Sequence, residues 1–259
     1  MPKIHFYKYQ AAGNDFVLVD NREGKLKFSV SQISKLCDRR FGIGADGLIS
    51  LEKDPTLDFK MIYFNSDGSE GFCGNGCRAI VHFAHKLGMT EKTARFSAFD
   101  GNHDAMILSD GVVRQSLVDV NRIEPRGEDY FINTGTEHNI RFVKNLASYP
   151  VVEEGRKIRA SDTYKPKGTN ADFVEVHADG SVSFRIYERG VEDETWSSGS
   201  GATACALAVA KKYNRSSPIK LNAKGGILEV EFKVSQDGTF HNIYLTGPVV
   251  LVFETSAEV

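Results

Sequence analysis

Two segments place a residue that can exchange a proton directly before a Gly-x-Gly turn. They are Cys73-Gly74-Asn75-Gly76 and Ser198-Gly199-Ser200-Gly201, and an apolar segment of helical character follows each. The first N–H groups of a helix lack partners within it, so two converging helix starts can hold a carboxylate between residues 73 and 198. A helix start also stabilises thiolate, and we expect Cys73 to be more acidic than a free thiol. The alternative interpretation of Cys73 is a small buried residue before an ordinary helix.

The other glycine and cysteine patterns indicate less chemistry. Gly42–Gly47 matches G-x-G-x-x-G, but it follows a helix and enters a strand, which is the reverse of a dinucleotide site. The sequence has neither a G-x-x-x-x-G-K-[ST] loop nor a G-x-S-x-G elbow. Cys73 and Cys77 are spaced like half of a metal site, but no second pair follows, so no metal is expected.

The sequence repeats itself faintly at a spacing of about 125 residues. Besides the two Gly-x-Gly segments, three blocks align in the same order: Phe96–Gly101 with Leu221–Gly226, Ala45-Asp46 with Ala171-Asp172, and Gly13-Asn14 with Gly135-Thr136. Chance is the alternative, but the near-constant spacing favours an internal duplication. It predicts two halves, residues 1–122 and 123–247, with the C-terminal strand 248–259 as a candidate completion of the first half.

Residue patterns predict similar elements in both halves. The predicted strands are 4–9, 16–20, 47–51, 59–64 and 112–120 in the first half and 130–134, 140–143, 173–177 and 183–188 in the second. The predicted helices are 30–41, 78–87 and 203–213. The last two are apolar on most faces, so we expect protein to surround them. The expected fold is therefore α+β, with two pseudo-symmetric halves that each curl a sheet around a central helix.

Composition and charge exclude several classes of protein. The chain has 259 residues, of which 41% are hydrophobic and 25% charged, values typical of a folded, water-soluble protein. A formal net charge of −2 gives no positive excess for nucleic acid or anionic lipid. No apolar run has the length of a signal peptide or membrane span, and four cysteines are too few for a disulfide scaffold. We therefore expect a cytoplasmic protein with neither a nucleic-acid nor a membrane partner.

Over nearly its whole length the sequence resembles the diaminopimelate epimerases. The blocks that carry the resemblance are Gly13–Phe16, Arg39–Gly47, Asn65–Glu70, Cys73–Arg78, Asn133–Gly135 with His138, Gly168–Asn170 and Tyr187–Thr195. The resemblance implies two α/β halves of mostly antiparallel sheet, a substrate cleft between them, and often a homodimer. It also implies a cofactor-independent isomerase of lysine and cell-wall biosynthesis that interconverts LL- and meso-diaminopimelate.

The resemblance also implies roles for individual residues. One base is needed on each face of the weakly acidic α-carbon, and these positions fall on Cys73 and Ser198. The reacting carboxylate is expected against Gly74-Asn75 and Gly199-Ser200. The distal amino-acid group is expected at Asn14, Asn65, Asn170, Glu188 and Arg189, with Arg189 as a carboxylate fork. His138 and Glu188 match positions that tune the two bases.

Ser198 is the departure that matters, because the family has cysteine there. A hydroxyl is a far weaker acid than a thiol, so two-base epimerisation by this sequence is in doubt. Cys205 lies two turns along the helix and cannot substitute. Ser198 is explained by an engineered change, by a paralogue with altered chemistry, or by an inactive protein that kept the cleft.

The alternatives to an epimerase are a related cofactor-independent racemase or isomerase with another substrate, and a binding protein for a diamino dicarboxylate. Thr136-Glu137 stands where the family often has asparagine and proline, which affects recognition of the distal group.

Overall fold

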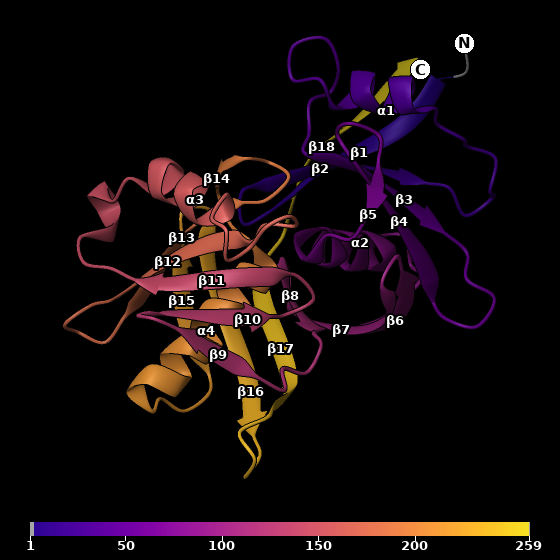
Figure 1. The fold of residues 1–259 in the computed structure, drawn as a ribbon. Coiled ribbons are helices and arrows are strands. Elements are labelled where there is room, and N and C mark those ends of the chain that lie inside the picture. The colour runs from indigo at the N-terminus through magenta and orange to yellow at the C-terminus, as the bar shows by residue number, and fades with distance from the viewer. Residues whose placement is uncertain (1–2, 259) are drawn as a thin grey trace. The chain divides into compact units, whose positions relative to one another are not determined.

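The computed structural model describes residues 3–258, which form two compact units (Figure 1). The first unit joins the chain up to Gln115 with the C-terminal segment from Gly247, and the second is Ser116–Thr246. Within residues 3–258, no helix combines the length and the apolar character needed to cross a membrane.

The first unit pairs its strands in the order β18-β1-β2-β3-β4-β6-β7-β8. Their bounds are β1 Lys3–Ala11, β2 Asn14–Asp20, β3 Gly47–Glu52, β4 Phe59–Asn65, β6 Thr93–Ala98, β7 Gly101–Ser109, β8 Val112–Ser116 and β18 Val250–Glu258. Neighbours are antiparallel except β2 with β3 and β4 with β6, which are parallel. The short β5 (Glu70–Gly71) adds to β4. Helix α1 (Val30–Cys37) connects β2 to β3, and α2 (Gly74–Lys86) connects β5 to β6.

The second unit pairs its strands in the order β9-β10-β11-β12-β13-β15-β16-β17. Their bounds are β9 Ile123–Arg126, β10 Asp129–Asn133, β11 Glu137–Phe142, β12 Asn170–Val176, β13 Val182–Glu188, β15 Ile219–Ala223, β16 Gly226–Val234 and β17 Phe240–Pro248. The parallel pairs are β11 with β12 and β13 with β15, and the others are antiparallel. The short β14 (Asp193–Thr195) adds to β13, α3 (Val151–Arg159) connects β11 to β12, and α4 (Gly199–Tyr213) connects β14 to β15.

The two units therefore have the same sequence of strand pairings, parallel at the same two places. Each element of the first unit has a counterpart in the second, and β18 from the end of the chain takes the part that β9 takes in the second unit. This agreement confirms the expected α+β fold with two similar halves.

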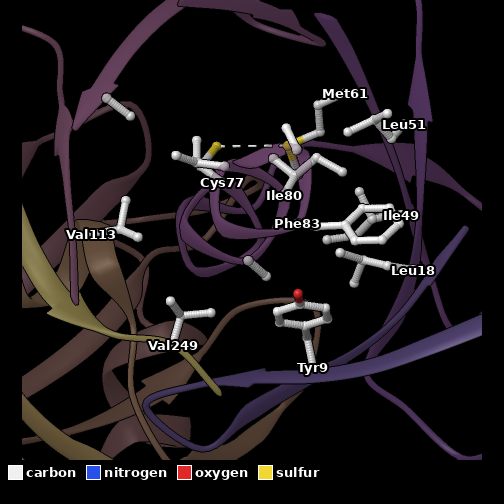
Figure 2. Packing of buried hydrophobic residues seen from close by; sticks show 14 of the residues in the cluster. Tyr9, Leu18, Ile49, Leu51, Met61, Cys77, Ile80, Phe83, Val113 and Val249 are labelled. Atoms are coloured by element: carbon white, nitrogen blue, oxygen red, sulfur yellow. Dashed lines mark hydrogen bonds between the residues drawn. The ribbon is translucent and has the colours of Figure 1, made fainter. Parts of the chain in front are cut away.

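Helix α2 forms the centre of the first unit's core. It contacts β1, β2, β3, β4 and β7, so the sheet curls around it. Figure 2 shows Cys77, Ile80 and Phe83 of the helix among Tyr9, Leu18, Ile49, Met61 and Val249, which come from strands and the C-terminal segment. The side chains of this helix are apolar on most faces, so the helix is stable only where protein surrounds it.

Helix α4 occupies the same position in the second unit. It contacts strands β10, β11, β12, β13, β15 and β16. Alanine is the commonest of its buried residues, and Ala202, Ala204, Ala206 and Ala208 are all 0% exposed. Because these side chains are small, the backbone of the surrounding strands lies close to the helix. The polar side chains of these strands therefore also lie close to it.

Both central helices begin earlier than the sequence patterns predicted. Helix α2 starts at Gly74 rather than Arg78, and α4 starts at Gly199 rather than Thr203, so each Gly-x-Gly segment is the first helical turn. Glycine lowers the propensity for the interior of a helix, but at its first turn the N–H groups lack helical partners in any case. Helix α3 was not predicted, and neither were strands β5, β6, β7, β9, β14, β15, β16 and β17.

Candidate functional site

Cys73 and Ser198 have equivalent positions at the starts of the two central helices. Each is the residue before the helix, with extended backbone angles of φ −140° and ψ 111° for Cys73 and φ −134° and ψ 128° for Ser198. Ser198 Oγ accepts a hydrogen bond from the Gly201 N–H at 3.2 Å, as a capping serine does. Among the described residues, the Cys73 side chain makes no such capping bond.

The Cys73 thiol faces Asn14, the first residue of β2. Sγ donates to Asn14 Oδ1 at 3.4 Å, and Asn75 Nδ2 donates to the same oxygen at 3.2 Å. Asp46 Oδ2 accepts from Asn14 Nδ2 at 2.5 Å and so fixes which way the amide points. Because an amide oxygen only accepts, the Cys73 thiol is the donor of this hydrogen bond.

A two-residue hairpin positions Asn14. Ala12 and Gly13 link β1 to β2 with φ values of 52° and 86°. Positive φ at both central residues is typical of the tight turns that join twisted antiparallel strands, and glycine adopts it without strain. Asn14 is thereby fixed at the first position of β2.

A buried arginine lies one turn into α2. Arg78 is 0% exposed, and its Nη2 donates to Asn75 Oδ1 at 2.7 Å. Its Nε and Nη1 are buried without a hydrogen-bond partner among the described residues. Burial lowers the pKa of this guanidinium to about 10, which leaves it charged at neutral pH. The motif Cys73–Arg78 contains this residue, but no pattern in the sequence indicated a role for it.

In the second unit a line of hydrogen bonds runs from Ser198 to a buried aspartate. Ser198 Oγ lies 3.3 Å from Ser200 Oγ, and Ser200 Oγ lies 3.1 Å from His138 Nε2. His138 Nδ1 lies 2.7 Å from Asp172 Oδ2, and both side chains are 0% exposed. Thr136 Oγ1 joins this line, at 2.9 Å from His138 Nε2 and 3.0 Å from Ser200 Oγ.

Helix α4 leaves just enough room for the carboxylate of Asp172. A Cβ on Gly201 would come within 2.5 Å of Asp172 Oδ1, an oxygen that is buried without a hydrogen-bond partner among residues 3–258. Burial, and then the charge of Asp172, raise the pKa of the Cys205 thiol well above its usual range. Cys205 therefore lines this site as a protonated thiol. It does not occupy the position of residue 198.

A second polar group lies beside this line, at the starts of β11 and β12. Asn170 Nδ2 donates to the Glu137 carbonyl at 3.0 Å, and the Arg189 N–H donates to Asn170 Oδ1 at 2.9 Å. Arg189 Nη1 donates to Glu137 Oε2 at 3.2 Å and to the Gly168 carbonyl at 3.1 Å. Lys167 Nζ contacts the other oxygen of Glu137 at 3.1 Å. Arg189, the residue expected to bind the substrate carboxylate, therefore already binds the carboxylate of Glu137.

Asn65 and Glu188, both expected at the distal group, end the equivalent strands β4 and β13. Asn65 Nδ2 donates to Ser69 Oγ at 3.0 Å, and Thr195 Oγ1 donates to Glu188 Oε1 at 2.5 Å. Neither residue joins the groups around Cys73 or His138 through the bonds described above.

The structure brings the sequence-predicted residues into three groups. Asn14, Cys73, Gly74 and Asn75 lie together in the first unit, whereas His138, Ser198, Gly199 and Ser200 form one group and Asn170 and Arg189 another in the second. The sequence analysis gave no role to Asp172, although the repeated Ala-Asp pair was a signal for it. In each half this aspartate fixes a side chain at the start of a strand, Asn14 through Asp46 and His138 through Asp172.

Comparisons with known proteins agree with this architecture. A sequence model of the family described as diaminopimelate epimerase matches residues 6–121 and 130–252. A diaminopimelate epimerase from Flavobacterium psychrophilum is 47% identical over 256 residues, covering 98% of this chain and 100% of that protein. One from Chlorobaculum tepidum is 39% identical, covering 93% and 96%.

Solved structures with low sequence identity share the fold. A PhzF-family phenazine biosynthesis protein from Bacillus anthracis has a TM-score of 0.79 at 14% identity, with 100% of both chains covered. A probable proline racemase from Agrobacterium radiobacter K84 has a TM-score of 0.69 at 12% identity, covering 99% of this chain and 93% of that one.

Proposed function

The chain belongs to the diaminopimelate epimerase family, and we propose that it interconverts LL- and meso-diaminopimelate by moving a proton at the α-carbon without a cofactor. The observation that carries the proposal is the setting of Cys73. Its thiol stands at the start of a buried helix and donates a hydrogen bond to an amide oxygen that Asp46 fixes in place. A protonated thiol at a helix start can give up its proton because the helix end stabilises the thiolate that remains.

The proposed chemistry needs an acid and a base on opposite faces of the α-carbon. An α-proton next to a carboxylate is very weakly acidic, so the negative charge that develops must be stabilised as the proton leaves. We assign one face to Cys73 and the other to Ser198, because these match the two acid/base positions of the family. The N–H groups at Gly74-Asn75 and Gly199-Ser200 bind the reacting carboxylate. Arg78 adds a positive charge one turn into α2.

The distal amino-acid group is assigned to Asn14, Asn65, Asn170, Glu188 and Arg189. The pair between Glu137 and Arg189 bears on this assignment, because a substrate carboxylate has to displace or share the Glu137 carboxylate. This pair is also the observation that favours the second candidate, a related racemase or isomerase whose substrate ends in a different group. The homodimer and the cytoplasmic location stay predictions.

Chiral chromatography of reaction mixtures tests the proposed function. The protein is incubated with LL-diaminopimelate, with meso-diaminopimelate and with a panel of other amino acids, and Cys73→Ala is the matched control. We expect each diaminopimelate isomer to yield the other, and no inversion by the control. Inversion of a different amino acid alone would favour the second candidate. Binding of diaminopimelate by calorimetry without inversion would favour a binding protein instead.

A further inference from the structure

The side chain at position 198 cannot act as a base by itself, as a thiolate can. An alcohol is a much weaker acid than a thiol, so Ser198 alkoxide is not available near neutral pH without a base that takes up its proton. The described line of hydrogen bonds leads from Ser198 to such a base. From Ser198 Oγ to Ser200 Oγ is 3.3 Å, from Ser200 Oγ to His138 Nε2 is 3.1 Å, and from His138 Nδ1 to Asp172 Oδ2 is 2.7 Å.

We propose that His138 holds the proton exchanged on the Ser198 face, that the hydroxyls of Ser198 and Ser200 relay it, and that Asp172 is the positioning residue that orients the imidazole. This inference rests on the proposed function, and it assigns the base that the substitution of oxygen for sulfur at position 198 leaves missing.

One assignment of donors and acceptors carries a proton along the whole line toward His138. The relay requires the tautomer in which His138 Nδ1–H donates to Asp172, because a carboxylate only accepts, and in which Nε2 carries a lone pair. The Ser200 hydroxyl can donate to that lone pair and accept from Ser198. Ser198 Oγ accepts from the Gly201 N–H, which leaves its own proton for Ser200. Every hydroxyl in the line can thus pass a proton toward His138.

The transfer balances in protons and charge. The Cα–H bond of the substrate breaks, and its proton goes to Ser198 Oγ as the Ser198 proton passes to Ser200 and the Ser200 proton to His138 Nε2. The electron pair stays on the substrate, where the carboxylate delocalises it, and the Cys73 thiol gives a proton to the opposite face of the α-carbon. His138 ends as imidazolium beside Asp172, and Cys73 ends as thiolate. The reverse reaction or exchange with solvent restores both.

The setting of Asp172 fits a positioning role. The residue is 0% exposed, and its partner His138 is also 0% exposed, so an imidazolium formed there is paired inside the protein. Gly201 allows the close approach, because any side chain at that position would collide with Asp172 Oδ1. Thr136 Oγ1 contacts both His138 Nε2 and Ser200 Oγ and so keeps the two in register.

Paired variants test the relay with a readout that a purely structural role would not move. Exchange of the α-proton in D2O is measured for Asp172→Asn and Ser200→Ala, each in the natural chain and in the Ser198→Cys background. In the natural chain we expect kcat to fall by roughly 10²-fold, with KM within about twofold. With a thiol at position 198, which can ionise and accept the proton itself, we expect the same changes to lower kcat by about threefold or less.

Thr203→Val is the matched control, because the Thr203 hydroxyl donates to the Gly199 carbonyl within α4 and takes no part in the line from Ser198 to Asp172 described above. It should leave kcat unchanged in both backgrounds. Losses of equal size in the two backgrounds would mean that Asp172 and Ser200 act structurally, and this would overturn the relay.

The tautomer of His138, read by ¹⁵N NMR of the resting protein, gives a test that needs no turnover. The relay requires a protonated Nδ1 and an unprotonated Nε2. A protonated Nε2 would overturn the inference whatever the substrate. By contrast, the proposed function would be overturned if neither the natural chain nor the Ser198→Cys variant exchanged the α-proton of any diaminopimelate isomer. The NMR result would still decide the inference.

Discussion

Glu137 binds the Arg189 guanidinium, which we expect to receive the distal carboxylate of the substrate. The distance from Arg189 Nη1 to Glu137 Oε2 is 3.2 Å, and both side chains are about three-quarters buried, with exposed fractions of 24% and 23%. A carboxylate held at this position competes with a substrate carboxylate for the same donors.

Glu137→Gln is therefore expected to lower the KM for diaminopimelate by roughly three- to tenfold with kcat little changed, since one ion pair to a partly buried group is removed. Steady-state kinetics checks this. Lys167→Gln is the control, because it removes the other cation on Glu137 and leaves the pair with Arg189 in place. A KM that rises in Glu137→Gln would mean that Glu137 orients Arg189 for the substrate instead.

The four cysteines should differ sharply in reactivity. Burial raises the pKa of Cys37 to about 11, and it raises the pKa values of Cys77 and Cys205 well above the usual range. A thiol stays protonated, and unreactive toward alkylating agents, below its pKa. Cys73 is the one half-buried cysteine. Iodoacetamide at pH 7.5 should therefore modify Cys73 first, as peptide mass spectrometry can determine. Equal labelling of Cys73 and Cys37 would contradict this.

At the residue scale, local patterns and the family resemblance predicted acid/base roles for Cys73, Ser198 and His138, but neither gave a role to Asp172. Cys73 and Ser198 stood out because a reactive residue before Gly-x-Gly is a local pattern. Asp172 and His138 are 34 residues apart and meet only because β11 and β12 pair in parallel. The contact between Glu137 and Arg189 likewise spans 52 residues. Contacts of this kind depend on strand pairing, which local patterns do not specify.

At the scale of the element, the first turns of α2 and α4 offer a matched comparison. Gly201→Ala would bring a Cβ within 2.5 Å of Asp172 Oδ1, whereas Gly76→Ala at the equivalent position of α2 meets Ile49 Cδ1 at 3.0 Å and Met61 Cε at 3.1 Å. A side-chain end can move aside at lower cost than a buried carboxylate that is already hydrogen-bonded.

We expect Gly201→Ala to lower the free energy of unfolding by about 2 kcal/mol and to reduce kcat, while Gly76→Ala costs less than about 1 kcal/mol. Urea unfolding and exchange kinetics measure the two effects. Equal costs for the two variants would contradict a close fit around Asp172.

A second element-scale prediction concerns the ion pairs that join β1, β2 and the loop before β3. Asp15 Oδ2 lies 2.6 Å from Lys8 Nζ, and Asp15 Oδ1 lies 2.7 Å from Arg39 Nη2. Burial alone would raise the pKa of Asp15, but the hydrogen bonds from Arg39 and Lys8 outweigh it and lower the pKa to about 2. A lowered pKa stabilises the folded state at a pH above the unfolded value, and the contribution is lost as pH falls through the folded value.

Asp15→Asn should therefore lower the free energy of unfolding by on the order of 2 kcal/mol at pH 7, and the difference from the natural chain should shrink between about pH 4 and pH 2. Urea titrations across this range check the prediction. Asp162→Asn is the control, since the Asp162 side chain is 94% exposed and should contribute little at any pH. A difference that stays constant down to pH 2 would contradict the argument.

The elements themselves were partly predictable. Apolar patterning located both central helices, but not their first turns, because Gly74–Gly76 and Gly199–Gly201 read as turns by composition. Helix α3 was missed because only Val151, Gly155 and Ile158 of its nine residues are buried, a narrow face with a glycine in it. The short strands β5 and β14 pair through the backbone over a few residues and leave no pattern in the sequence.

At the scale of the whole molecule, the duplication was visible in the sequence because the two units keep their helix starts in the same order. The first unit also contains the end of the chain, because β18 pairs with β1 along Lys3–Gln10. Val249, directly before β18, is 1% exposed in the core around α2 (Figure 2).

A chain that ends at Pro248 should therefore unfold about 10 °C or more below the full chain, because β1 loses one partner strand and exposes its edge. Thermal unfolding followed by circular dichroism measures this. A chain shortened only by Val259 is the control, since it keeps all of β18. An unchanged melting temperature for the longer truncation would contradict the assignment of β18 to the first unit.

Whether Cys73 and the hydroxyl line ending at His138 together invert an α-carbon is tested most directly by α-proton exchange of LL- and meso-diaminopimelate in D2O, followed by NMR. We predict that the natural chain inverts and exchanges both isomers, that Ser198→Cys does so roughly ten- to a hundredfold faster, and that Cys73→Ala inverts neither. Inversion by Cys73→Ala at the rate of the natural chain, or no exchange by the natural chain and by Ser198→Cys alike, would contradict the claim.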